Sequence, residues 1–402
     1  MDKLIITRQN YKSNCEGEKP FYVCLRIDEN GPTDLELCPT DQKLTETVGT
    51  IFVAKIKDIA PQMKAVFVEI APGCTCYLEM KHFENAWFVK RARKEQLTQG
   101  DELVVQIKKE PIKTKYAIVS TKIELPGQYM VITNEQRPTG YSAKLSKEQK
   151  ERLQKMDLSA DKDCALIFRT NAATATADEL LLEYHSLHET FRQLRQNYAY
   201  RTCYSVLHQS KPFYSRMLKS IPRTMLERVI TDEPHIFREI SEEYAADVFI
   251  QERLQLYDND SYSLGQCFGI SRLLDRTLNE RVWMKSGAYL LIQQTEAMTV
   301  IDVNSGKKEA KKKHTEDYFL QVNLEAAEEI ARQLRLRNIS GICMVDFINL
   351  KSKEQQDILQ KRLTELLRLD PVGAQFVDFT RLGIAEITRK KVRKSLRQQM
   401  EQ

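Results

Sequence analysis

The sequence predicts a multidomain chain of α+β and α/β structure, in which a small five-stranded barrel precedes an open α/β sheet. The chain has 402 residues, too many for a single hydrophobic core. Short strand-like runs fill residues 48–121 and are mostly separated by turns rich in Pro and Gly. Strands then alternate with helices in the last third. We therefore expect two to four domains.

The composition is that of a folded protein, with 42% hydrophobic and 29% charged residues. A net charge of +5 permits a nucleic-acid partner but does not argue for one. The nine cysteines follow no zinc-binding spacing, so reduced thiols are expected and a structural zinc site is not. The first residues lack a signal-peptide pattern, and no apolar run approaches 18 residues. We expect a cytoplasmic protein without a membrane partner.

The first 45 residues show short strand patterns and no helical period, which indicates a piece that completes a sheet built elsewhere. The barrel is predicted from five strand-like runs, with a basic, helix-like insert at 83–97 before the fourth. This layout is that of an OB-fold, although other small barrels have similar strand counts. The five runs are 49–59, 63–70, 74–78, 102–109 and 116–121.

The next segments contain both strand-like and helix-like hydrophobic patterns. Strands are expected at 129–133 and 165–169, and helices at 146–155, 176–197, 222–229 and 234–253. After the strands of the last third, the basic run 389–394 is expected to be a helix that faces solvent or RNA.

Two acids end neighbouring strand patterns near the C-terminus. The β-branched run Met298–Asn304 ends in polar residues, and a period of two puts Asp302 and Asn304 on one face. A helix pattern follows at 323–338, and a second apolar strand closes on Asp346. Strand, helix, strand is a crossover unit, so the two strands should be parallel neighbours with both acids at the carboxyl edge.

Two carboxylates brought together would repel each other, and a hard divalent cation such as Mg²⁺ removes the conflict. Asn304 offers a neutral oxygen ligand beside them. The alternative is that each Asp only caps the segment that follows it. A basic run directly after Asn304 is suited to neutralising a polyanion there, although such runs are usually solvated. Its members are Lys307, Lys308, Lys311, Lys312, Lys313 and His314.

Other residues suit RNA. Phe67 and Tyr77, on the second and third barrel strands, offer stacking surfaces for unpaired bases, with a core position as the alternative for Phe67. Lys113 and Lys115 are placed to hold phosphates before the fifth strand. Arg169 with Thr170 ends a strand and suits a terminal phosphate, although such a pair is usually an ordinary surface feature.

With these residues in view, the chain closely resembles the ribonuclease E/G family of bacterial endoribonucleases. The stretches that carry the resemblance are 296–305, 323–337 and 341–347, and it extends more loosely over nearly the whole chain. It implies an RNase-H-like part in two pieces, an S1-like OB-fold that binds RNA, a 5′-sensor and a DNase-I-like catalytic part. The implied segments are 1–45 with 211–275, 46–123, 124–210 and 276–402.

The resemblance also implies roles. Asp302 and Asp346 would hold the catalytic Mg²⁺, and Asn304 would position the attacking water or the phosphate. The expected reaction hydrolyses single-stranded RNA to 5′-phosphate and 3′-hydroxyl ends, in rRNA and tRNA processing and in mRNA turnover. Phe67, Tyr77 and Lys115 would line the RNA channel. A pocket for a 5′-monophosphate would be built by Gly127, Val131, Arg169, Thr170 and Arg381.

The chain departs from the family pattern in two places. The run Asn171-Ala172-Ala173 replaces a stretch that commonly contains Gly, and the last cysteine is Cys343, ahead of where larger members carry a Cys-Pro-x-Cys zinc link. We therefore expect a ribonuclease-G-like protein without zinc, whose homodimer, if it forms one, is not bridged by zinc. The rival hypotheses are a non-catalytic RNA-binding protein and, more weakly, an exonuclease.

Overall fold

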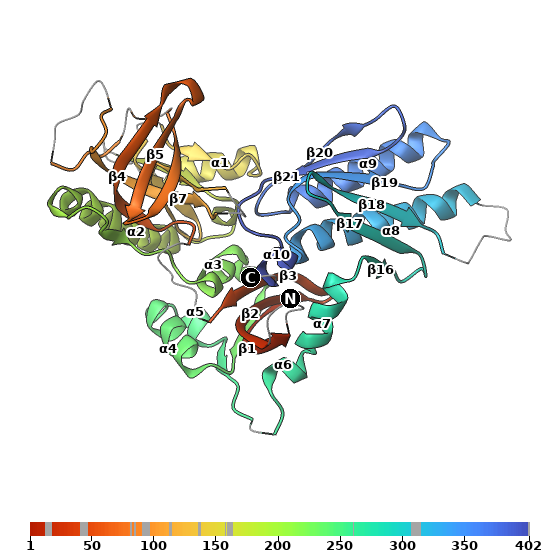
Figure 1. Cartoon of the computed structure of the whole chain (residues 1–402). Helices are drawn as coiled ribbons and strands as arrows, with labels where there is room; N and C mark the ends of the chain where they lie inside the picture. Colours follow the sequence, from red (N-terminus) through yellow and green to blue (C-terminus); the bar gives the residue numbers. More distant parts are fainter. Residues whose placement is uncertain are drawn as a thin grey trace. The chain divides into compact units, whose positions relative to one another are not determined.

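The computed structural model describes residues 1–12, 18–40, 47–80, 83, 86–90, 97–111, 115–135, 138–156, 158, 164–259, 261–306 and 315–400. The chain divides into two compact units (Figure 1). The first consists of Met1–Gln42 with Met225–Gln402, and the second of Lys43–Thr224. Within the described ranges, no helix has the length and apolar character needed to cross a bilayer.

The first unit begins with a five-stranded sheet in the order β15-β14-β1-β2-β3. The central strand β1 lies parallel to β14 and antiparallel to β2, and its residues Leu4, Ile5 and Ile6 are fully buried. The prediction that the N-terminal piece completes a sheet built elsewhere is therefore confirmed. The strands are β1 (Asp2–Lys12), β2 (Glu18–Asp28), β3 (Gly31–Pro39), β14 (Leu226–Thr231) and β15 (Leu254–Leu256).

Helices cover this sheet, and short α6, α7 and α10 contribute Leu264, Ile270 and Leu396 to its core. The predicted helix over 234–253 is interrupted, since α4 ends at Glu243 and α5 begins at Val248. The helices are α4 (Pro234–Glu243), α5 (Val248–Gln251), α6 (Leu264–Cys267), α7 (Ile270–Leu278) and α10 (Leu396–Met400).

The predicted helix over 222–229 is wrong. A single 3₁₀ turn, Arg223–Met225, leads straight into β14. Leu226, Val229 and Ile230 are buried between β1 and β15, so the pairing partners decide the conformation of this short apolar run. Its spacing alone fits a helix as well as a strand.

The second sheet of the first unit is the predicted open α/β sheet, in the order β16-β17-β18-β19-β21-β20. Helices α8 (Thr315–Leu336) and α9 (Lys353–Arg368) pack their apolar stripes against one of its faces, as their shared core shows (Figure 1). The strands are β16 (Arg281–Trp283), β17 (Tyr289–Gln294), β18 (Met298–Asn304), β19 (Gly341–Asp346), β20 (Ala374–Phe379) and β21 (Ala385–Arg389).

The predicted basic helix over 389–394 is also wrong. Arg389 is the last residue of β21 and is only 6% exposed. Its Nε donates to Asp370 at 2.6 Å, and its Nη1 donates to the backbone oxygen of Ile339 at 3.0 Å. A guanidinium paired inside the protein in this way cannot face RNA. The remaining residues of the run, 390–394, are not helical.

The second unit contains the predicted five-stranded barrel, which closes because β4 pairs with both β5 and β7. Strand β13 (Val206–His208) adds to β4 outside the barrel. In the insert at 83–97, residues 86–90 are not helical, and 84, 85 and 91–96 lie outside the described residues. The barrel strands are β4 (Ile51–Ala60), β5 (Ala65–Ala71), β6 (Cys74–Glu79), β7 (Glu102–Lys109) and β8 (Ala117–Ser120).

A four-stranded sheet in the order β11-β12-β10-β9 follows in the same unit. The predicted helices at 146–155 and 176–197 are confirmed, and each starts at a capping box, on Ser146 and on Thr176. The elements are β9 (Glu124–Pro126), β10 (Met130–Thr133), β11 (Gly140–Tyr141), β12 (Ala165–Phe168), α1 (Lys147–Gln154), α2 (Ala177–Asn197) and α3 (Phe213–Ser220).

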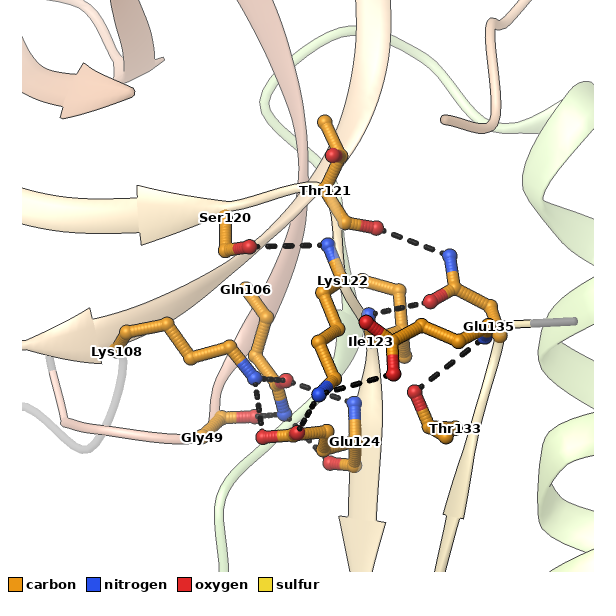
Figure 2. A network of polar contacts seen from close by, with 11 residues as sticks. Gly49, Gln106, Lys108, Ser120, Thr121, Lys122, Ile123, Glu124, Thr133 and Glu135 are labelled. Atoms are coloured by element: carbon orange, nitrogen blue, oxygen red, sulfur yellow. Dashed lines mark hydrogen bonds and ion pairs between the residues drawn. The ribbon is translucent and has the colours of Figure 1, made fainter. Parts of the chain in front are cut away.

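A polar network joins the barrel to this sheet (Figure 2). Lys108 of β7 donates to Glu124 of β9 at 2.8 Å, and Lys122 forms ion pairs with Glu124 at 2.9 Å and Glu135 at 3.1 Å. The Gln106 side chain bonds the backbone N–H and C=O of Glu124, at 2.9 and 2.8 Å. Strand β9 is therefore fixed to the barrel by both its backbone and its side chain.

The network shifts the pKa values of its members. Burial lowers the pKa of Lys108. Burial alone would raise the pKa of Glu124, but the ammonium groups of Lys108 and Lys122 outweigh it and hold that pKa below its ordinary value. A carboxylate with a depressed pKa stabilises the folded state above its unfolded pKa, and this contribution is lost as the pH falls through the folded pKa.

Glu124→Gln should therefore lower the free energy of unfolding of the second unit by about 1–3 kcal/mol at pH 7, because two half-buried cations lose a charged partner. The difference from the parent should begin to shrink below about pH 4.3, where Glu124 of the unfolded chain takes up a proton, and should be lost as the pH falls through the lower pKa of the folded state. Urea unfolding followed by tryptophan fluorescence measures this difference. The chain has two tryptophans, so Trp283→Phe in both proteins leaves only buried Trp87, in the second unit, as the reporter. Glu189→Gln, at an exposed pair with Arg192, is the control. Equal stability at pH 7 would contradict the account.

Helix α8 fixes the loop that follows β19. The Asn323 side chain is fully buried, donates to the backbone oxygen of Ile348 at 2.8 Å and accepts from its N–H at 3.0 Å. Ile348 stands two residues after Asp346. One side chain therefore determines where the chain leaves the strand.

Asn323→Ala should lower the stability of the first unit by about 1–3 kcal/mol, because it takes the side-chain partner from two partly buried backbone groups. The loss should be local, so amide hydrogen exchange in peptides spanning 346–350 should speed up more than in β17. Gln321→Ala, at an exposed position two residues earlier in the helix, should leave exchange unchanged. Uniform exchange across the unit would argue against a local role.

Candidate active site and RNA interface

Strands β18 and β19 are parallel neighbours, and Asp302 pairs in register with Asp346. This is the arrangement that the strand–helix–strand pattern predicts. Partners in register present their side chains to the same face. That face is the one opposite the helices, because Ile301, Val303 and Val345 alternate with the acids and are buried in the core. Asp302 is half-buried and Asp346 is exposed.

Asn304 lies on the same face as Asp302 and donates from Nδ2 to Asp302 Oδ2 at 2.6 Å. The hydrogen bond fixes one carboxylate oxygen and turns the amide toward the acid pair. Two carboxylates with an amide form an oxygen donor set, the chemistry that Mg²⁺ prefers. No cluster of three or more His, Cys, Asp or Glu that suits a metal occurs among the residues the structure describes.

A glycine directs the chain after Asn304. Gly306 has φ of +73°, and a Cβ there would stand 2.5 Å from the backbone oxygen of Gly287. The chain therefore passes directly over the turn between β16 and β17, where only glycine fits. The basic residues expected to lie above the acids fall outside the described residues: Lys307, Lys308, Lys311, Lys312, Lys313 and His314.

On the barrel, Phe67 and Tyr77 are cross-strand partners whose rings meet edge to face with centroids 6.3 Å apart. Both are half-buried and alternate with the core residues of their strands, so Phe67 is not a core residue. Tyr116, 54% exposed, lies 5.6 Å from the Phe67 ring and was missed in the sequence. Its signal was its place as the first residue of the predicted fifth strand. Lys115 beside it is exposed, and Lys113 lies outside the described residues.

Four of the five residues assigned to the 5′-phosphate pocket come together in the second unit. Arg169, at the end of β12, donates from Nη1 to the backbone oxygen of Gly127, and its N–H donates to Tyr129 at 2.7 Å. Val131 pairs across the sheet with Ile167, two residues before Arg169. Thr170 is exposed and opens a 3₁₀ turn that holds Asn171, Ala172 and Ala173, with its hydroxyl 3.0 Å from that of Ser142.

Glu183 of α2 organises the same loop, and sequence reasoning missed it. Its carboxylate accepts three successive backbone N–H groups, from Gln128 at 2.6 Å, Tyr129 at 2.7 Å and Met130 at 2.8 Å. A Cβ on Gly127 would stand 2.4 Å from this carboxylate, which explains the glycine. The available signal was an acid inside the apolar stripe of α2, beside Leu180 and Leu187.

Burial governs the electrostatics of this loop. It raises the pKa of Glu183, against the pull of the three N–H groups, and it lowers the pKa of Arg169, which the charge of Glu183 partly restores. The attraction of Glu183 thus opposes the effect of burial on the Arg169 guanidinium. The fifth residue, Arg381, belongs to the first unit and is exposed in the turn between β20 and β21.

The known proteins to which this chain is similar are ribonucleases. Residues 124–392 match the family described as Ribonuclease E/G. Ribonuclease G of Haemophilus influenzae is 30% identical over 364 residues, which cover 87% of this chain and 73% of that protein. Ribonuclease G of Escherichia coli K12 is likewise 30% identical, over 87% of this chain and 74% of its own. Ribonuclease E of Synechocystis is 30% identical over 86% of this chain and 52% of its own.

The matched family region takes in the strand pair with its acids and the loop with its arginine, and the match to ribonuclease G extends to most of the chain. The resemblance seen in the sequence is thereby confirmed. The chain belongs to the ribonuclease E/G family.

Proposed function

We propose that the chain is a Mg²⁺-dependent endoribonuclease that hydrolyses single-stranded RNA to 5′-phosphate and 3′-hydroxyl ends. The observation that carries the proposal is the in-register pair Asp302 and Asp346 on parallel neighbouring strands. Membership of a family of ribonucleases supports the enzyme class. The assignment of the first sheet to an RNase-H-like part and of the last to a DNase-I-like part belongs to the same proposal.

The donor set fits the ion. Asp302 and Asp346 would hold Mg²⁺, and their shared face leaves its remaining positions open to water and phosphate. A bound Mg²⁺ would supply Lewis acidity toward the phosphate and lower the pKa of water. Asn304 keeps one oxygen of Asp302 in a fixed direction, so the carboxylate is oriented before RNA arrives.

The barrel supports a single-stranded substrate. Phe67, Tyr77 and Tyr116 form a continuous aromatic cluster on the barrel's outer face, and such rings stack on unpaired bases of any kind. Lys115 next to the cluster would hold the RNA backbone. We propose the same role for Lys113. Bases paired in a duplex have no free face for this surface.

We further propose that the loop around Gly127 and Val131, with Arg169 and Thr170, binds a 5′-monophosphate. An arginine fork beside an exposed hydroxyl suits a terminal phosphate. End-binding would orient a transcript for internal cutting, which fits rRNA and tRNA processing and mRNA turnover in the cytoplasm and argues against an exonuclease. A non-catalytic RNA-binding protein is the second candidate, favoured by the aromatic barrel face, but such a protein has no use for an in-register acid pair.

Asp302→Asn and Asp346→Asn should each reduce cleavage of a 5′-monophosphorylated single-stranded RNA by about 1,000-fold or more, since metal contributes several kcal/mol at the transition state. RNA binding, measured by fluorescence anisotropy, should survive. Asp378→Asn makes the same change at an exposed position of the same sheet and should cut normally. Cleavage at the parental rate by either active-site variant would refute the mechanism.

Arg169→Ala should abolish the preference for monophosphate over hydroxyl ends, bringing the ratio of the two cleavage rates to about 1. Thr170→Val, at an exposed position, should reduce the ratio without endangering the fold. Arg201→Ala, another exposed arginine of this unit, is the control. The sensor assignment fails if both variants keep the parental ratio while cleaving hydroxyl-ended RNA normally.

A further inference from the structure

The face of the sheet that carries the acids is not covered by helices α8 and α9, and it also carries aromatic side chains. Through the register of the strands, Asn304 faces Tyr289, which in turn faces Trp283. Asp302 faces Leu291, which faces Arg281. All of these side chains therefore lie on one face, in two rows that start at the candidate active site and run toward the edge strand β16.

The rings at the edge of the sheet form a small exposed cluster. Trp283 is 61% exposed, and its ring centroid lies 5.1 Å from that of Tyr289 in a tilted arrangement. The Arg281 guanidinium lies over the Tyr289 ring at 4.7 Å and 5.8 Å from the Trp283 centroid. Val282 between them turns inward to the core. Strand β16 thus places both of its large side chains, Arg281 and Trp283, on the outer face, where they add nothing to the hydrophobic core.

The cluster has the chemistry of a base-stacking surface. An exposed indole and a phenol ring offer π faces, and the guanidinium adds a cation that suits both a base and a phosphate. Neighbouring strands lie about 4.8 Å apart, so β16 is about 10 Å from the strand of Asp302. A stacked RNA strand advances about 3.4 Å per nucleotide and an unstacked one more, which brings a base one to three nucleotides from the acids onto the cluster.

We infer that Trp283 and Tyr289, with Arg281, form a platform for an unpaired RNA base one to three nucleotides from the bond that is cut. This rests on the proposed function and adds to it a residue that selects the substrate next to the reaction centre. Trp283 is the leading contact because its ring is the more exposed of the two. The platform favours RNA that presents an unstacked base at that position.

The first test pairs protein variants with RNA lacking single bases. Single-turnover cleavage with Mg²⁺ is measured on one 5′-monophosphorylated oligonucleotide and on abasic versions at each of three positions to either side of the cut. With the parent enzyme, loss of the base at one position should slow cleavage about 10-fold. Trp283→Ala should be about 10-fold slower on intact RNA and should lose nothing more from that abasic position, while Trp283→Phe should keep part of the effect.

Val377→Ala removes another exposed apolar side chain, on edge strand β20 of the same sheet, and should behave like the parent. The inference is overturned if Trp283→Ala still shows the full loss of rate at the abasic position that slows the parent. It is equally overturned if the variant alters only the sedimentation of the protein, since Trp283 would then contact a second copy of the chain.

A second measurement separates this inference from the proposed reaction. In the Asp302→Asn background, binding of the same RNA should quench the fluorescence of exposed Trp283, and the quenching should vanish when Trp283→Phe leaves only buried Trp87. Quenching without any Mg²⁺-dependent cutting by the parent would retain the platform and reject the nuclease mechanism. Cutting by the parent without quenching in the Asp302→Asn background would retain the nuclease mechanism and reject the platform.

Discussion

The parallel pairing of β18 with β19 is the constraint on which the rest of the last sheet depends. Parallel neighbours cannot be joined by a short turn, so the chain must cross over one face, and α8 makes that crossing with its apolar stripe against the sheet. Because the helix covers one face, the alternate residues of both strands are left on the other. Asp302 and Asp346 lie side by side on that face because the strands pair in register and the crossover helix covers the other face.

Three polar side chains fix the chain where strands of this protein end. Asn323 bonds the chain after β19, Glu183 gathers three N–H groups of the loop after β9, and Arg389 closes β21 on Asp370. In each case one polar side chain, placed among apolar residues, satisfies groups that would otherwise be buried without partners. Each candidate site adjoins a loop that such a residue fixes, so its geometry depends on the scaffold as well as on the loop sequence.

What the sequence predicts well is what local periodicity controls. The strand Met298–Asn304 and the five barrel strands were readable because each alternates or is bounded by turn residues. Prediction from the sequence is wrong where a residue far away in the chain decides the local conformation. The run 389–394 is basic in composition, but Asp370 lies 19 residues earlier and nothing local signals the pair. Residues 226–229 became a strand only because β1 supplies an edge more than 200 positions away. Glu183, Tyr116 and Trp283 needed register and burial to show which way they point.

The interleaved first sheet has a consequence for synthesis. Strand β1 leaves the ribosome early, but its parallel partner β14 follows only after the whole second unit has been made. At about 5–20 residues per second, that delay is roughly 10–45 s. During it, the apolar strand bearing Leu4, Ile5 and Ile6 has an unpaired edge, the kind of surface that recruits other chains. The second unit, contiguous in sequence, is free to fold in that interval, so the order of assembly is set by topology, with the candidate active site completed last.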